Sequence, residues 1–318
     1  MKKLSVLLVV MVLLSGLFFG CRRDGDDQLR VVFIARTLGD TFPAWLQDAL
    51  EVEAAALGIQ LVTQNGMGDD MLIADLVDAA IVGGFDVILL QPQNTEAQRP
   101  PAERAVSAGV PLVTVNLRIP GMENVTHSVD ADPFEQGAVV ARFAVDQVPQ
   151  NGRVVILNGP AAHPHSEERR RAWGEIFLAQ RPDVTVLGED FANWNKDEAM
   201  ALMETWVVAH GQIDAVLSMN DNMAAGAIEA VRGNPLFSNL LVYGVDGTAE
   251  AALLIRDGYM TATSFQNAFL LAEYSMSIIN AILTGRQVGF TNIDIDCPLI
   301  TVDNVQGLIE AHVRAGAL

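Results

Sequence analysis

Polar and aromatic side chains gather in short segments of this chain, and most of these segments follow a run of apolar, β-branched residues. The polar members are Asp40, Asn116, Asn220, Asp246 and Gln266, and the aromatic members are Phe42 and Trp194. Planar amides and carboxylates pair donors and acceptors with vicinal hydroxyls, and aromatic faces suit the C–H face of a pyranose ring. The set therefore predicts recognition of a sugar-like molecule. Helix capping remains the alternative for each Asn or Asp taken singly.

Short apolar runs alternate with amphipathic helical patterns from residue 29 onward. Strands are predicted at 31–35, 59–63, 87–90, 112–115, 154–157, 184–187, 215–218, 240–245 and 261–265. Segments with helical apolar spacing, such as 42–57 and 199–209, separate most of them, which indicates βαβ units and parallel sheets. These strands are too many for one small open sheet, so we predict an α/β fold with two doubly wound parallel-sheet lobes. Ligands bind beyond the carboxyl ends of strands in such sheets, where the polar set falls.

The composition excludes several classes of protein. The 318 residues are 50% hydrophobic and carry a formal net charge of −19, so nucleic acid is not expected as a partner. Two cysteines make neither a disulfide framework nor a Cys-rich zinc site, and Cys297 is expected to be a buried small hydrophobe. No nucleophile elbow, phosphate-binding loop or dinucleotide fingerprint is present. We therefore expect a protein that is not an enzyme and has no cofactor, metal or catalytic residue.

The first residues look like an export signal. A basic start at Lys2 and Lys3 precedes an apolar run that is too short to span a membrane. Residues 1–20 are therefore predicted to be a signal peptide. Gly20-Cys21 resembles a bacterial lipobox, which implies lipidation of Cys21 and a tether over 21–28. The folded part is then expected on the periplasmic or cell-surface side, anchored to the membrane as a lipoprotein.

Seven segments, in order along the chain, resemble those of the periplasmic sugar-binding proteins related to the galactose/glucose- and ribose-binding proteins. The first four are 38–42 (LGDTF), 110–116 (VPLVTVN), 158–169 (NGPAAHPHSEER) and 192–195 (ANWN). The other three are 219–227 (MNDNMAAGA), 243–248 (YGVDGT) and Gln266. The galactose/glucose-binding members are the most similar, although Gln266 is the ribose-type choice. His165 replaces an aspartate of the galactose/glucose members.

This resemblance implies a type I periplasmic binding fold whose lobes close around the ligand by a hinge of three crossovers, near Ala131, Gln266 and Asp294. The lobes would comprise 29–131 with 267–294, and 132–266 with 295–318. His163 and Arg169 would join the residues above as ligand-binding residues, with Arg171 as a rival for Arg169. Phe42 and Trp194 would sandwich the ring.

The expected function is capture of a glucose- or galactose-like hexose for an ABC permease in the inner membrane, by a monomer held on its lipid anchor. A sugar-sensing receptor for a chemotaxis or kinase partner is one alternative. A pentose or a polyol such as inositol is an alternative ligand. The ligand domain of transcriptional repressors shares this fold, but an export signal stands where their DNA-binding segment would be.

Overall fold

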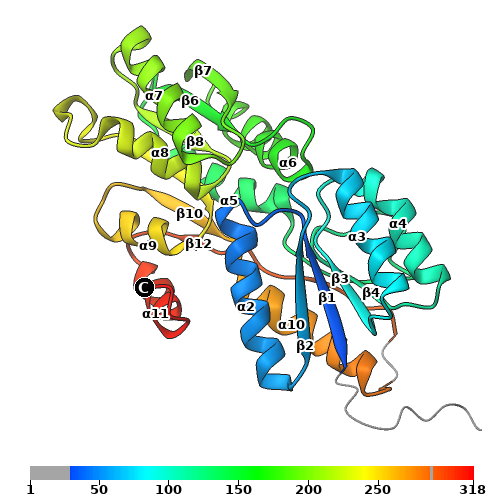
Figure 1. Ribbon diagram of the computed structural model, residues 1–318. Coiled ribbons are helices and arrows are strands. Elements are labelled where there is room, and N and C mark those ends of the chain that lie inside the picture. Colours follow the sequence, from blue (N-terminus) through cyan, green and yellow to red (C-terminus); the bar gives the residue numbers. More distant parts are fainter. Residues whose placement is uncertain (1–28, 287–288) are drawn as a thin grey trace, which may run out of the picture.

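The structure is a computed structural model that describes residues 29–286 and 289–318. The predicted signal peptide over 1–20, the predicted lipidation site Cys21 and the predicted tether over 21–28 lie outside these residues. Within them the strands form two six-stranded sheets, with helices on both faces of each (Figure 1). Strand order is β11-β5-β4-β3-β1-β2 in the first sheet and β12-β10-β9-β8-β6-β7 in the second. The predicted α/β fold with two doubly wound lobes is confirmed.

The N-terminal lobe is built on the first sheet. Its strands are β1 (Arg30–Ala35), β2 (Gln60–Asn65), β3 (Val87–Leu90), β4 (Leu112–Asn116), β5 (His127–Asp130) and β11 (Asn292–Asp294). Its helices are α2 (Thr41–Leu57), α3 (Asp70–Val82), α4 (Thr95–Ser107) and α10 (Ala268–Leu283). Alternate residues of β1 face opposite sides: Val31 and Phe33 pack with α2 and α10, whereas Val32 and Ile34 pack with α3 and α4.

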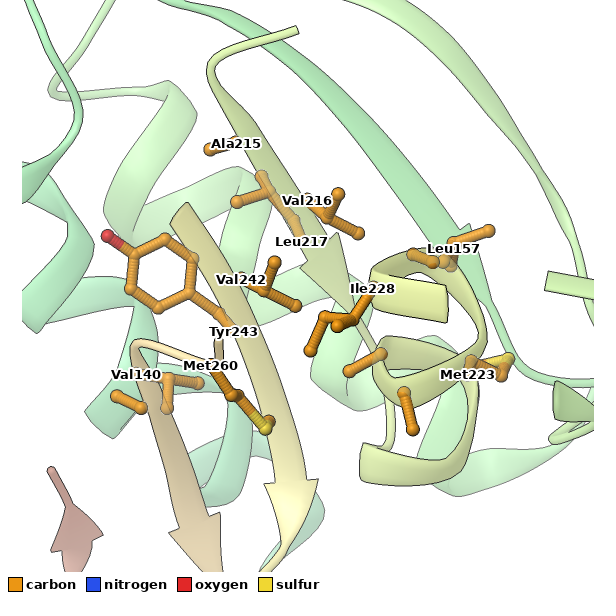
Figure 2. Close-up of a cluster of buried hydrophobic side chains, with 14 of the residues drawn as sticks. Val140, Leu157, Ala215, Val216, Leu217, Met223, Ile228, Val242, Tyr243 and Met260 are labelled. Atoms are coloured by element: carbon orange, nitrogen blue, oxygen red, sulfur yellow. The ribbon is translucent and has the colours of Figure 1, made fainter. Parts of the chain in front are cut away.

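The C-terminal lobe repeats this plan on the second sheet. Its strands are β6 (Arg153–Asn158), β7 (Thr185–Phe191), β8 (Ala215–Ser218), β9 (Leu241–Asp246), β10 (Ala262–Phe265) and β12 (Leu299–Ile300). Its helices are α5 (Pro133–Gln147), α6 (Pro164–Ala172), the π-helix η1 (Trp173–Leu178), α7 (Lys196–His210), α8 (Asp221–Val231), the 3-10 turn η2 (Pro235–Phe237), α9 (Ala249–Arg256) and α11 (Val305–Arg314). Figure 2 shows part of the core, with Leu217 and Val242 of the strands beside Ile228 of α8.

The chain passes between the two sheets three times. It leaves the first sheet after Asp130 of β5, returns after Phe265 of β10, and leaves again after Asp294 of β11 to form β12. Strand β12 pairs antiparallel with β10, while the other paired strands of the described residues are parallel. Each lobe is therefore assembled from two separate stretches of sequence.

Each strand predicted from the sequence corresponds to a strand of the structure, with differences at the ends. The largest difference is in β7, predicted to end at Leu187 but continuing to Phe191. Three further strands escaped prediction: β5, β11 and β12. They are short, and β5 and β11 carry polar residues, so none shows an apolar run that marks a buried strand.

Helix α8 approaches α7 so closely that a glycine is needed at their contact. A Cβ atom on Gly226 would lie 2.1 Å from the carbonyl oxygen of Lys196. We predict that Gly226→Ala lowers the free energy of unfolding by about 1–3 kcal/mol, the usual cost of overpacking. Gly307→Ala is the matched control because it is also helical but meets nothing within 4 Å, and it should leave stability unchanged or raised. Urea unfolding measures both, and equal stability of the two variants would contradict the prediction.

Candidate functional site

The structure brings all nine of the predicted ligand-binding residues to one cavity between the lobes. The lining consists of Arg36, Asp40, Phe42, Asn116, His163, His165, Arg169, Trp194, Asn220, Asp246 and Gln266. The space open to the centres of water molecules is about 30 Å³. A cavity of this size takes a few waters or one small solute, and an extended polymer does not fit. The shared cavity is a finding about position, and ligand binding by these residues stays a prediction.

Several lining residues occupy strained backbone positions at the ends of strands and in the turns that follow. Asn116 ends β4 with φ at 71°, Asp246 ends β9 at 126°, and Trp194 follows β7 at 62°. Residues other than glycine rarely adopt positive φ, and such strain gathers at functional sites. All three side chains line the cavity.

Two polar residues at helix starts play different parts. Asn220 caps α8, because its Oδ1 accepts the backbone N–H of Met223 at 2.9 Å. Asn220 also lines the cavity, and its Nδ2 makes no hydrogen bond within the described residues. Asp40 precedes α2 without capping it and instead pairs with Arg36 at 2.5 Å. Capping, the alternative considered from sequence, therefore applies to Asn220 and not to Asp40.

Arg169 is the buried arginine of the site. Its guanidinium donates to the side chain of Gln136 at 2.9 Å, the carbonyl of Met219 at 2.7 Å and the side chain of Gln266 at 2.6 Å. It also donates to Asp246 at 3.4 Å. One of its five N–H donors, on Nη1, makes no hydrogen bond within the described residues.

The rival Arg171 points elsewhere. It is exposed, pairs with Glu168 and Glu175 on its own helical segment, and lies over the ring of Phe134. Arg169, and not Arg171, therefore faces the cavity.

Trp194 is held by its neighbours. Its ring meets His163 edge-on at 5.6 Å between centroids, and the guanidinium of Arg169 lies 5.6 Å from it. A Cβ atom on Gly159 would stand 2.2 Å from the indole, so the bare backbone after β6 makes the room that this ring needs. Phe42, the other predicted stacking ring, lines the same cavity from the first turn of α2.

The two histidines are neutral at physiological pH. Burial, reinforced by the charges of Arg36 and Arg169, lowers the pKa of His163 to about 3. Burial likewise holds the pKa of His165 well below its usual value, with Arg169 adding to the effect. Neither ring nitrogen of His163 has a hydrogen-bond partner in the described chain. A neutral imidazole offers one donor and one acceptor, which is what a hydroxyl group can pair with.

The carboxyl groups at the end of β9 are buried together. Burial raises the pKa of Asp246, against the attraction of Arg169. Burial also raises the pKa of Asp221, which accepts hydrogen bonds from the backbone N–H groups of Gly247 and Thr248 and from the hydroxyl of Thr263. Asp221 therefore fixes the loop that carries Asp246.

Sequence reasoning missed three residues of this site. Arg36 directly follows β1, and the segment singled out above, 38–42, begins two residues after it. His165 was noticed as a departure from the galactose/glucose members but not placed in the site. Gln136 is fully buried in the first turn of α5 and looks in sequence like any polar residue of an amphipathic helix.

Other features of the described residues bear on chemistry. Their side chains include no group of three His, Cys, Asp or Glu placed to hold a metal ion. None of the helices in 29–286 and 289–318 is long and apolar enough to cross a membrane. Cys297 is buried, as expected, and burial raises the pKa of its thiol to about 12, so it is unreactive at neutral pH.

A family model described as a periplasmic binding protein domain matches residues 31–287. The chain belongs to this family. Among its relatives, the xylitol-binding protein of Mycolicibacterium smegmatis is 30% identical over 268 residues, covering 84% of this chain and 75% of the relative. The ribose import binding protein RbsB of Bacillus subtilis is 29% identical over 252 residues, covering 79% and 81%. The Caulobacter myo-inositol binding protein, solved with myo-inositol, superposes with a TM-score of 0.82 at 26% identity, covering 92% and 99%.

Two of the three passages between the lobes of this periplasmic binding protein, the first and the third, are tied together by one arginine. Arg118, two residues after β4, pairs with Asp130 at 2.7 Å and also with Asp294. Asp130 and Asp294 are the last residues of β5 and β11, where the first and third passages leave the first sheet. Burial raises the pKa of Asp130 to about 6, against the attraction of Arg118.

The lowered pKa of His163 makes stability depend on pH. In the unfolded chain the imidazole of His163 takes up a proton near pH 6.5. In the folded protein the same imidazole stays neutral until about pH 3. The free energy of unfolding therefore falls as the pH is lowered through this window, by on the order of 3 kcal/mol at pH 4 for this group. We predict that His163→Gln flattens this acid-side loss in urea unfolding from pH 7 to 4.

The exposed His210 of α7 provides the control. His210→Gln should keep the wild-type pH profile, because this side chain lies on the surface and outside the cavity. The raised pKa of Asp246 makes the free energy of unfolding rise as the pH is lowered, but Asp246 is present in every variant compared, so its contribution cancels. A His163→Gln profile parallel to that of the wild type would show that the imidazole is not held neutral.

Proposed function

We propose that this protein captures one small uncharged sugar or polyol in the cavity between its lobes and delivers it to an ABC permease. The observation that carries the proposal is the pairing of charges in the site. Arg36 pairs with Asp40 and Arg169 with Asp246, so neither arginine is free to hold an anionic ligand. The other polar groups of the lining are amides and neutral imidazoles, and together with these internally paired charges they suit hydroxyl groups.

In this proposal the aromatic rings of Phe42 and Trp194 stack on the carbon skeleton of the ligand. The hydroxyl groups are bound by Asp40, Asn116, His163, Arg169, Asn220, Asp246 and Gln266. Neutral hydrogen bonds contribute about 0.5–1.5 kcal/mol each and charged ones about 1.5–3. Together with stacking, this set reaches the roughly 8 kcal/mol of a micromolar site after the costs of ordering and closure.

Relatives support a pentose or polyol at least as well as the hexose predicted from sequence. Proteins named for xylitol and ribose are among the curated relatives, and one similar solved structure holds myo-inositol. His165 stands where the galactose/glucose members carry an acid, and Gln266 is the ribose-type residue. We therefore place pentoses, pentitols and cyclitols ahead of glucose and galactose as ligands.

Delivery requires export and a conformational signal. We propose that residues 1–20 direct export and that a lipid on Cys21 holds the monomer at the membrane. Lining residues come from both lobes, so the ligand stabilises their closed arrangement relative to an open one. A permease can distinguish the two arrangements.

A thermal-shift panel tests the proposal. Xylitol, D-ribose, myo-inositol, D-glucose and D-galactose are added to the wild-type protein and to the Trp194→Ala and Arg169→Ala variants. At a hundredfold excess over Kd, a ligand should raise the wild-type free energy of unfolding by about 2.7 kcal/mol and so its melting temperature. Both variants should lose most of this shift. No shift with any compound, or full shifts in both variants, would contradict the assigned ligand or site.

The cap at Asn220 allows a sharper test. Asn220→Asp keeps the capping oxygen on the N–H of Met223 but replaces the Nδ2 donor by an acceptor. We predict a lowered melting temperature without ligand, because a further carboxylate is buried beside Asp221 and Asp246, and a loss of affinity of about tenfold or more, measured by calorimetry. The control is Asn195→Asp, an exposed cap of α7 outside the cavity, which should bind as the wild type does. Equal losses of affinity in the two variants would contradict the prediction, because the added negative charge alone would then explain them.

A further inference from the structure

Four side chains form a continuous chain of hydrogen bonds from the C-terminal lobe to the N-terminal lobe, which we call the amide relay. Arg169 Nε donates to Gln136 Oε1 at 2.9 Å, and Gln136 Nε2 donates to Gln266 Oε1 at 2.7 Å. Gln266 Nε2 then donates to Asn116 Oδ1 at 2.5 Å. All four residues are buried. Water therefore does not compete for the hydrogen bonds of the relay.

The direction of the amide relay is set by Arg169, because a guanidinium has donors and no acceptor. Gln136 must turn its oxygen to Arg169, which leaves its nitrogen for Gln266. The oxygen of Gln266 is held twice, by Gln136 and by Arg169 Nη2 at 2.6 Å. Its nitrogen therefore faces Asn116. A reversed amide anywhere along the relay would place two donors or two acceptors against each other.

We infer that the amide relay makes Asn116 a hydrogen-bond donor toward the ligand, with Gln136 as the positioning residue that holds the relay in register. The oxygen of Asn116 is used by Gln266, so its Nδ2 group is what the cavity receives. The ligand must then present an oxygen that accepts at this point, and an analogue without that oxygen is rejected. The role toward ligand rests on the proposed function of the cavity.

The amide relay also crosses the junction between the lobes. Gln136 stands in the first turn after the first passage, and Gln266 directly follows β10 on the second. Asn116 ends β4 in the N-terminal lobe. The relay is complete only while the lobes hold this arrangement. The orientation that makes Asn116 a donor therefore depends on the closed arrangement of the lobes.

The donor role of Asn116 toward the ligand is tested by Asn116→Asp. Aspartate also tolerates the positive φ of this position, and it keeps an oxygen for Gln266, but it turns a second acceptor to the ligand. Binding of the five probes named above is measured by calorimetry at one pH and salt concentration. We expect Kd to rise about tenfold or more for every probe that binds the wild type. An unchanged or lower Kd would overturn the inference.

The role of Gln136 is tested by Gln136→Met, with Gln98→Met as the matched control. Gln98 is equally buried and makes three side-chain hydrogen bonds, but in α4 outside the cavity. Both variants should melt at lower temperature, whereas only Gln136→Met should raise Kd, by about fivefold or more. A wild-type Kd in Gln136→Met, or equal rises in the two variants, would overturn its positioning role.

A measurement without ligand separates this inference from the proposed function. If the wild type binds none of the probes, the proposed function fails, and the amide relay is judged by melting temperatures of Gln136→Met, Asn116→Gly and the double variant. These residues meet only through Gln266, and glycine accepts the backbone of position 116. We expect the double variant to lose less than the sum of the single losses. Additive losses would overturn the relay.

Discussion

The buried charge of Arg169 is the constraint on which the arrangement between the lobes depends. A guanidinium removed from water is costly unless nearly all of its donors are used. Here the partners come from α5, from the end of β8, from β9 and from the turn after β10, so the charge is satisfied only where several elements meet. The same contacts that hold the charge also orient the amides of the cavity. Structural stability and ligand recognition therefore share one set of hydrogen bonds.

The doubly wound sheets explain why these partners can meet at all. Parallel strands end along one edge of each sheet, and the two edges face each other across the passages between lobes. Side chains from far-separated parts of the sequence then enter one small space. Asn116, Trp194 and Asp246, which stand in strained turns at strand ends, line this space. Backbone strain of this kind persists only where surrounding contacts fix it.

The sequence was enough to predict the lobes, the longer strands and seven cavity residues, because strand ends and apolar runs are local patterns. The family resemblance added His163 and Arg169. Spacing could not decide between Arg169 and Arg171, since both belong to one helical segment and only packing buries the first. The role of Gln136 could not be predicted from local spacing either, because its hydrogen-bond partners lie 33 and 130 residues away in the sequence. Strands β5, β11 and β12 are defined by the neighbours they pair with more than by their own residues.

The last stretch of the chain adds an edge strand to each sheet, β11 to the first and β12 to the second. During synthesis, neither lobe can finish its sheet until nearly the whole polypeptide has left the ribosome. A nascent chain of this topology lacks an edge strand in each sheet for most of its translation. Late completion of this kind is compatible with carrying an unfolded polypeptide across a membrane before it acquires its final shape.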